Sequence, residues 1–405
     1  MDRSKVGAGI ALLGLVFAVV PPAAAGTETA VTTQVRLRYE GSDRSFQPDV
    51  GATHGVYQRV RVRLDHKHES GVRGVAQLQD SRVWGMEGST TTDTMNADLH
   101  QGYLSLDIAQ VDGLTVSAGR KEWAYGRQRV IGSLGWSNVG RAFDGVQVHQ
   151  KFGEHWLDLA FAKVSEDKTA ASDENVALAV FHLSVPNSAC NLEPFVIYRE
   201  VQDAQTFTTS VGTYGNWQHG RFQVQEDFVF QRSEVRSSTF DGWLFAVDAA
   251  VDVSGAADGS LGGLVGYSTY TGNDPMDADD AAYSQLYPTG HAFHGSMDIA
   301  QPFADMLGSG LRDLHAKVWL KTAGGIKVVA AGHVFTSEVE ATGVPGDGND
   351  IGQELDVTIT GRLAAGPVLE VGSGYFIAGD LMNSFPSPKS ADDALWAYAQ
   401  LTADF

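Results

Sequence analysis

Cysteine is almost absent from this sequence. The single cysteine, Cys190, cannot form an intramolecular disulfide, and it completes no Cys/His pattern of a metal site. We interpret it as an inert small residue. A fold held together by several internal disulfides is therefore excluded.

Long apolar runs are also missing. Beyond the first 25 residues, no stretch approaches the roughly 18 uncharged apolar residues that indicate a transmembrane helix. Proline is modest at 12 residues, whereas glycine reaches 46 and aromatic residues make up 10%. This composition favours many strands and turns over packed helices. No linker-like run divides the chain, so we predict one domain over residues 26–405.

Basic residues are scarce, with 29 Lys and Arg against 49 Asp and Glu, and the net charge is −20. The bases are concentrated early. Residues 27–151 carry 15 bases and 14 acids, whereas residues 152–405 carry 12 bases and 34 acids. No long basic run occurs, so nucleic acid is not an expected partner.

The first 25 residues have the layout of a secretory signal peptide. Arg3 and Lys5 precede an apolar run from Ile10 to Val20, and three alanines end the segment at Ala25. The apolar core is about half the length that a membrane-spanning helix needs. We therefore predict a signal peptide over residues 1–25 that is removed after Ala25.

The last twelve residues, ALWAYAQLTADF, alternate between two faces. Counting back from Phe405, alternate positions as far as Leu395 are apolar, and the intervening positions contain the polar groups. This is the pattern of a strand with one lipid-compatible face. A terminal aromatic residue on that face resembles the recognition strand that the barrel-assembly machinery reads. With the signal peptide, it predicts a transmembrane β-barrel in a Gram-negative outer membrane.

Strand-like segments separated by short turn signals recur along the chain. We predict an all-β, antiparallel transmembrane barrel of about 18 strands, with 16 as the alternative count. The three longer polar connections are predicted at Gly85–Asp98, Gly272–His294 and Ala341–Asp350; the second is long enough to fold over the mouth or into the lumen. The predicted strands are 31–40, 56–67, 71–80, 99–108, 113–121, 144–152, 155–165, 175–184, 193–202, 206–216, 221–232, 241–252, 260–270, 313–323, 326–337, 351–363, 366–378 and 394–405.

Arginines alternate with apolar residues in two early segments, TTQVRLRYE and VYQRVRVRLDHK. A soluble sandwich would show the same alternation, with arginine facing bulk water. In a barrel, arginine facing lipid near the bilayer centre costs about 2–4 kcal/mol. The arginine face is therefore predicted to point into a wet lumen. Its members are Arg36, Arg38, Arg59, Arg61 and Arg63.

Residues 119–146, GRKEWAYGRQRVIGSLGWSNVGRAFDGV, resemble the alginate-export family of outer-membrane barrels. The matching pattern is G-R-x-E, then Y-G-x-Q-R, W-S-N and R-x-F-D-G. Two shorter segments, YPTGHAFHG at 287–295 and GSGYFIAGDLM at 372–382, are similar to the same family. The resemblance implies a monomeric barrel that passes an anionic polysaccharide through an arginine-lined lumen by diffusion. The carried-over pore-lining positions are Arg120, Arg129 and Arg141, with Glu122 of the same run.

Arginine suits this role because its planar guanidinium pairs with carboxylates and keeps its charge at any working pH. The alternative is that these arginines pair with acids such as Glu40, Asp65, Asp80 or Glu122 and only brace the lumen. Outer-membrane lipid and lipopolysaccharide, the assembly machinery and a periplasmic export complex are the further expected partners. The residues do not distinguish export from uptake.

Three other functions are weighed against this one: a general or small-anion porin, a structural or adhesive barrel, and a barrel lipid hydrolase. No nucleophile motif frames a serine, so we do not expect an enzyme. No cofactor or metal is expected either. His66 and His68 share a strand face but lack a third ligand, and the acidic residues at 274–280 do not follow a calcium-loop pattern.

Overall fold

The computed structural model describes residues 27–405 except 45–50, 87–96, 167–172, 187, 203, 254–258, 275–280, 305–308, 342–347, 365 and 385–392. The predicted signal peptide lies outside the described residues and stays a prediction. None of the helices in the described part of the chain has the length and apolar character needed to cross a membrane.

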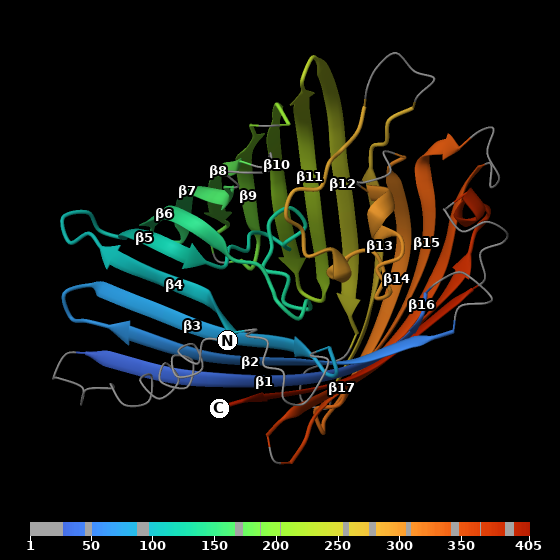
Figure 1. Ribbon diagram of the computed structural model, residues 1–405, viewed down its shortest axis with the longest axis horizontal. Helices are drawn as coiled ribbons and strands as arrows, with labels where there is room; N and C mark the ends of the chain where they lie inside the picture. The colour runs from blue at the N-terminus through green and yellow to red at the C-terminus, as the bar shows by residue number, and fades with distance from the viewer. Residues whose placement is uncertain are drawn as a thin grey trace, which may run out of the picture.

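The described chain forms one sheet of 18 strands, and every neighbouring pair of strands is antiparallel (Figure 1). Each of the 18 predicted strands corresponds to one observed strand. The strands are β1 (Glu28–Asp43), β2 (Thr53–Lys67), β3 (Val72–Val83), β4 (Ala97–Asp107), β5 (Leu114–Lys121), β6 (Phe143–Phe152), β7 (His155–Ser165), β8 (Glu174–Ser184), β9 (Asn191–Val201), β10 (Thr206–His219), β11 (Phe222–Val235), β12 (Ser238–Asp252), β13 (Gly259–Tyr270), β14 (Leu311–Thr322), β15 (Lys327–Ala341), β16 (Gly348–Arg362), β17 (Val368–Ala378) and β18 (Ala394–Asp404).

The sheet closes into a barrel because β1 pairs with both β2 and β18. At the seam, Arg36 lies opposite Thr402 and Arg38 lies opposite Gln400. The backbone of Phe405 continues the pairing through hydrogen bonds of 2.8 and 3.0 Å with Thr33. The last strand therefore pairs with the arginine-bearing first strand, as the closure of the predicted barrel requires.

The two faces of the barrel wall have opposite character. Large apolar side chains such as Leu104 (64% exposed), Val265 and Leu355 lie bare on the outside. Polar side chains such as Gln231 and Glu354 are buried on the inside. A soluble protein would reverse this arrangement, whereas lipid covers the outer face of a transmembrane barrel.

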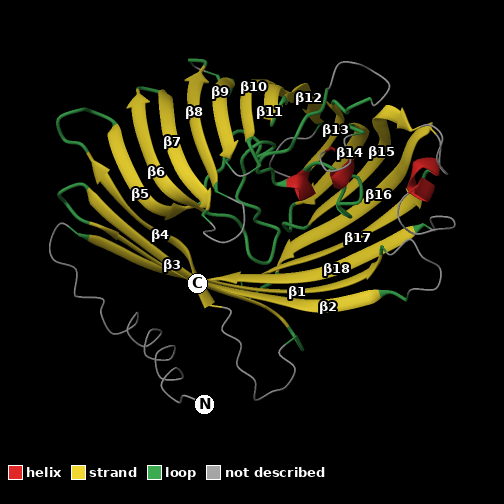
Figure 2. Ribbon diagram, turned by 45° about the horizontal axis from the view of Figure 1, so that its top comes forward, coloured by secondary structure: helices red, strands yellow, loops and turns green. Residues whose placement is uncertain are grey.

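Two connections fold into the ring of strands (Figure 2). We name residues 122–142, between β5 and β6, the first inserted segment. We name the described residues between β13 and β14, 271–274, 281–304 and 309–310, the second inserted segment, which contains the 3₁₀ helices Gly290–Ala292 and Gln301–Ala304. A third 3₁₀ helix, Asp380–Ser384, follows β17. Both inserted segments follow odd-numbered strands, so they leave the wall at the end opposite the chain termini.

The inserted segments are joined to each other by backbone hydrogen bonds. The amide of Gly132 donates to the Tyr287 carbonyl oxygen (2.8 Å), and the Tyr287 amide donates to the Val130 carbonyl oxygen (2.9 Å). Ile131 is only 1% exposed at this junction. Of the two positions expected for the connection from Gly272, over the mouth or into the lumen, its described residues take the second. The insertion of residues 122–142 was not predicted.

Candidate constriction site

The first inserted segment is held against the wall by arginines of β1 and β2. Arg36 donates to the carbonyl oxygens of Gly135 (2.9 Å) and Ser137 (2.8 Å). Arg59 donates to the same two oxygens at 3.2 and 3.0 Å. Arg38 donates to the carbonyl oxygen of Trp136 at 2.7 Å. The alternation of the two strands therefore delivers three guanidinium groups to three successive carbonyls.

Trp136 fixes the centre of this contact. The Arg38 guanidinium lies 4.0 Å from the Trp136 ring centroid, a cation–π distance. Trp136 also stacks on the His291 ring, with the centroids 4.2 Å apart, and makes a T-shaped contact with the Tyr398 ring at 4.9 Å. This one side chain links the first inserted segment to β1, to the second inserted segment and to β18.

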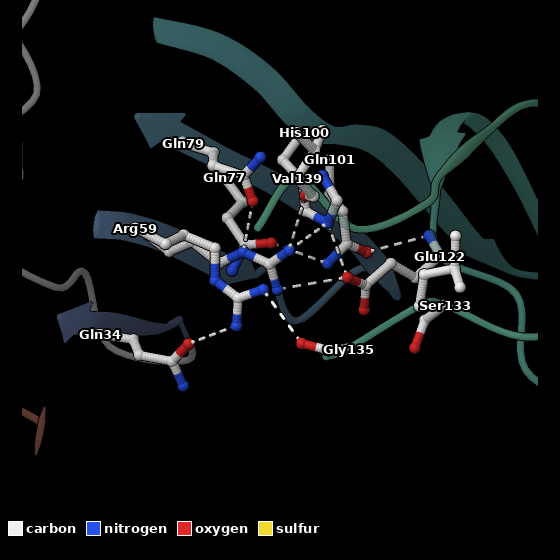
Figure 3. A network of polar contacts seen from close by, with 12 residues as sticks. Gln34, Arg59, Gln77, Gln79, His100, Gln101, Glu122, Ser133, Gly135 and Val139 are labelled. Atoms are coloured by element: carbon white, nitrogen blue, oxygen red, sulfur yellow. Dashed lines mark hydrogen bonds and ion pairs between the residues drawn. The ribbon is translucent and has the colours of Figure 1, made fainter. Parts of the chain in front are cut away.

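Arg61 continues the network toward the start of the first inserted segment. It donates to Gln79 (2.7 Å) and lies 3.4 Å from Glu122, which His100 contacts at 2.6 Å. Figure 3 shows that Arg59 points toward Gly135 and that His100 contacts Glu122. Burial acts to raise the pKa of Glu122, but the His100 hydrogen bond and the Arg61 charge outweigh it and lower that pKa.

The arginines near the first inserted segment outnumber their carboxylate partners. Arg38 pairs with Glu40 at 2.6 Å, and Arg61 pairs with Glu122. We define the cationic cluster as Arg36, Arg38, Arg59, Arg61, Arg141, Glu40 and Glu122. Five arginines and two glutamates leave it with a net charge of +3.

Arg36, Arg59 and Arg141 have no ion pair among the described residues. Arg141 donates to the carbonyl oxygens of Gly132 and Pro288, each at 3.1 Å. Burial lowers the pKa of Arg141 to about 10, so it still carries its charge at neutral pH. Carbonyl dipoles satisfy these hydrogen bonds without cancelling the charges. The alternative that the arginines only brace the lumen through acids is therefore incomplete.

Arg129 has a different environment. Its side chain is 2% exposed, contacts Asp227 at 3.3 Å and donates to the Tyr270 hydroxyl at 2.8 Å. Arg127 bridges Asp227 (2.5 Å) and Asp248 on the same side of the barrel. Arg129 therefore belongs to a buried ion-pair network between the first inserted segment and β11.

Sequence reasoning missed Arg127 and its two acids. Arg127 occupies the variable position of the Y-G-x-Q-R pattern, so the resemblance did not select it. Alternation along β11 and β12 was the available signal, because it places Asp227 and Asp248 on the inward face with the buried Gln231 and Leu244.

Arg120 does not line the lumen, contrary to the prediction. Lys121 takes the inward position, where it donates to Gln147 at 2.6 Å. Its neighbour Arg120 must then face outward, because adjacent strand residues point to opposite faces. There it pairs with Asp144 at 2.7 Å, with the two side chains 34% and 59% exposed. Arg120, Arg129 and Arg141 do not meet in the lumen.

Arg63 does point inward, but away from the first inserted segment. It contacts Asp65 at 3.1 Å, and Asp65 also accepts hydrogen bonds from Arg73. Four of the five arginines selected by alternation therefore converge on the first inserted segment. Of the three selected by the resemblance, only Arg141 lies in the cationic cluster.

Two solved structures share the fold of this chain. Pseudomonas aeruginosa OccK5 (OpdH) matches with a TM-score of 0.63 at 12% identity, covering 93% of this chain and 98% of that chain. Pseudomonas aeruginosa OpdO matches with a TM-score of 0.64 at 14% identity, covering 93% and 97%. A sequence search of curated proteins finds no match.

The family model described as alginate export matches residues 28–295, which include β1–β13 and the first inserted segment. The match contains all five arginines of the cationic cluster. The family match and the closed 18-stranded barrel place the protein in the outer membrane as a channel. The chain belongs to the alginate export family of outer-membrane β-barrel proteins.

Proposed function

We propose that this channel passes an anionic, uronate-containing polysaccharide such as alginate, or its oligomers, by passive diffusion past the cationic cluster. The observation that carries the proposal is the charge of Arg36, Arg59 and Arg141, which donate to neutral acceptors instead of carboxylates. Carboxylates of the polymer are the complementary charges.

The way in which the arginines are held favours movement over tight binding. Arg36 and Arg59 are 4% and 5% exposed, and their terminal N–H groups donate to backbone carbonyl oxygens and to the Gln34 side-chain oxygen. A passing carboxylate meets their electrostatic field without displacing those bonds. In the low dielectric of a narrow site this field is stronger than in water. The arginines therefore attract a carboxylate without forming paired hydrogen bonds to it. A permeating solute must also be able to leave, and this weaker attraction allows it to do so.

A general porin for small polar solutes is the second candidate. The supporting observation is the acidic wall, which we define as Asp227, Asp248, Asp313, Glu354 and Asp356 on β11, β12, β14 and β16. Strands β11 and β12 lie across the ring from β1 and β2 (Figure 1). Opposite charges on two sides of a lumen create a transverse field that suits many polar solutes.

Lipid hydrolysis is less well supported than either channel. His182 contacts the Ser184 hydroxyl at 3.1 Å and Glu193 at 2.7 Å, an order that resembles a catalytic triad. However, the Ser184 hydroxyl donates to the Glu154 carbonyl oxygen at 3.0 Å. His182 also lies opposite Trp156 on the inward face, away from lipid. These contacts describe a structural hydrogen-bond chain.

Planar-bilayer recordings test the proposal. We expect an anion-selective current that oligouronates interrupt at lower concentration than neutral oligosaccharides of the same length. The Arg36→Gln and Arg59→Gln variants should each lower both the anion preference and the oligouronate effect. Arg120→Gln, on the outer face, is the matched control and should change neither. Equal blocking by charged and neutral oligomers would favour the general porin, and the absence of any current would refute the channel.

A further inference from the structure

The lumenal face of β14 and β15 carries a cluster of two histidines and one aspartate that the channel proposal does not use. His315 lies directly opposite His333 in the strand register. Asp313 precedes His315 by two residues and therefore shares its face. All three side chains are buried, with 0% exposed for Asp313, 5% for His315 and 2% for His333. We name these residues the β14–β15 cluster.

The potential ligand atoms are close enough to share one ion. Asp313 Oδ2 lies 3.1 Å from His315 Nδ1, and Asp313 Oδ1 lies 3.0 Å from His333 Nδ1. One ligand atom from each residue falls within 4.8 Å of the others. A tetrahedral zinc ion with bonds of about 2.0–2.1 Å separates its ligand atoms by roughly 3.3 Å. The cluster needs only small shifts to reach that geometry.

His315 Nδ1 is a second, independent indication of a ligand. It is buried and makes no correctly oriented hydrogen bond, although Asp313 is near. The other ring nitrogen, Nε2, lies 3.0 Å from Asp248 Oδ1. In the tautomer whose Nε2–H donates to Asp248, the Nδ1 lone pair faces Asp313 and can bind a metal ion. Metal-ligating histidines are oriented by carboxylates in this way.

Asp248 is itself held in place. Arg127 of the first inserted segment donates to Asp248 Oδ2, and Arg127 also pairs with Asp227. The contacts therefore extend from the β14–β15 cluster through the Asp248 carboxylate to Arg127 of the first inserted segment.

A small cavity lies beside His333 of the cluster. It has a volume of about 80 Å³ and is lined by His333, Asp356, His291 and Lys317, among others. It leaves room for a water molecule as a fourth ligand. A site with two imidazoles and one carboxylate suits zinc and similar transition ions, whereas Ca²⁺ and Mg²⁺ prefer oxygen ligands alone.

We propose that the β14–β15 cluster is a binding site for a zinc-type divalent ion, ligated by His315 Nδ1, His333 Nδ1 and the Asp313 carboxylate. Asp248 is the positioning residue that orients His315. The ion cross-links β14 to β15 and reduces the negative charge of the acidic wall. The proposal does not depend on which solute the channel carries.

The test uses the full barrel without a histidine tag, refolded in detergent with metal-free buffers. Zinc is titrated by equilibrium dialysis against a competing chelator, and bound metal is measured by mass spectrometry. We expect one Zn²⁺ per barrel for the unaltered protein and loss of this binding in Asp313→Asn and His333→Ala. Asp248→Asn should still bind one ion, about 10- to 100-fold more weakly. A heat-dependent shift in electrophoretic mobility checks that each variant is folded.

The matched control is the double variant His66→Ala, His68→Ala. It removes two histidines that are close to each other in sequence, at the end of β2 and in the turn that follows. It should bind zinc as the unaltered protein does. If His333→Ala does not fold, the visible spectrum of Co²⁺ in the unaltered protein reports whether nitrogen ligands hold the ion. Absence of stoichiometric zinc, unchanged affinity in folded Asp313→Asn, or a preference for Ca²⁺ would each overturn the proposal.

Discussion

At the residue scale, the partners of each arginine decide what its charge does. Arg36 and Arg59 donate to backbone carbonyls of the first inserted segment and make no ion pair within the described part of the chain. Arg129 has the same chemical group, but Asp227 neutralises it within the wall. Arg120 faces away from the lumen altogether. Sequence position and residue type alone would have given all four the same role.

The Arg127 network predicts a large stability difference between two arginine variants. Arg127→Met removes the charge that pairs with both Asp227 and Asp248, which are 6% and 12% exposed. We expect it to reduce the free energy of unfolding by about 3 kcal/mol. Arg120→Met removes an exposed pair and should cost less than about 1 kcal/mol. Urea unfolding of vesicle-inserted protein, followed by tryptophan fluorescence, measures both, and equal losses would contradict the network.

Glu122 gives the cationic cluster a pH dependence. Its pKa lies below the ordinary value of 4.5, because His100 and Arg61 outweigh the effect of burial. The ionised carboxyl therefore stabilises the folded protein above that ordinary value, and this contribution is lost as the pH falls through the lowered pKa. Protonation also removes one negative charge beside the arginines.

We therefore expect Glu122→Gln to show a higher anion preference than the unaltered channel at neutral pH. The two should converge only when the pH falls below 4.5, where Glu122 of the unaltered channel becomes protonated. Reversal potentials in a salt gradient measure the preference at each pH. Asp144→Asn, on the outer face, is the control and should follow the unaltered channel throughout. Convergence already at neutral pH would show that Glu122 does not act on permeating ions.

At the element scale, the two inserted segments behave as one body because they share backbone hydrogen bonds and packed side chains. Ile131 and Tyr287 form a short parallel bridge between them. Trp136 then stacks on His291 across the same junction. Strands β1 and β2 hold one side of this body through arginines, and β11 and β12 hold the other through Asp227 and Asp248.

A substitution at Gly132 tests whether the junction between the inserted segments controls the current through the channel. A methyl group at Gly132 would lie 2.2 Å from Thr289 Oγ1 and 2.7 Å from Gln128 Cβ. We expect Gly132→Ala to push the inserted segments apart, at a cost of about 1–3 kcal/mol, and to make the single-channel current larger and less steady. Gly135→Ala is the matched control, because nothing lies within 4 Å of its added carbon. Identical currents in both variants would contradict a role for the junction.

The strands were predictable from the sequence because each one carries its own evidence. A period of two is visible within a single segment such as residues 155–165, whose predicted bounds equal those of β7. The first inserted segment has no such local signal. Its position depends on Arg36 and Arg59, about 100 and 76 residues earlier in the chain, reaching the Gly135 carbonyl. Every residue has a backbone carbonyl acceptor, so the residue types in the sequence do not indicate which carbonyl these arginines contact.

The β14–β15 cluster was hidden for a related reason. The sequence Asp313-x-His315 shows two ligands on one strand face, but the third, His333, becomes a neighbour only through the register of β14 and β15. His66 and His68 offered an equally suggestive spacing. In the structure His66 contacts Thr29 and His68 contacts Ser70, and neither joins a three-ligand group among the described residues.

At the scale of the whole molecule, the uneven distribution of charge along the chain becomes an arrangement around the barrel. The early strands β1 and β2 carry the arginines of the cationic cluster, and the later strands β11–β16 carry the acidic wall. Closure brings β18 beside β1, so the late part of the chain also packs against the cluster through Trp396 and Tyr398. The packing around Trp136 is therefore complete only in the closed ring.

The C-terminal residue allows assembly in the cell to be separated from stability of the ring. The Phe405 side chain is 77% exposed, and its backbone alone makes the two hydrogen bonds with Thr33. Phe405→Ser keeps those bonds, so the unfolding free energy of refolded protein should change by less than about 1 kcal/mol. If the assembly machinery reads the terminal aromatic, the same variant should show a large fall in folded outer-membrane protein in cells.

The amount of heat-modifiable barrel in purified outer membranes measures this effect, and Phe405→Tyr is the control that keeps an aromatic ring. We expect Phe405→Tyr to assemble like the unaltered protein and Phe405→Ser to accumulate unfolded in the periplasm. Because the outward side chain makes little contact with the barrel, a loss that appears only in cells has no source in the folded structure. Equal assembly of the two variants would mean that the terminal strand is recognised through its backbone and its alternating face, without Phe405.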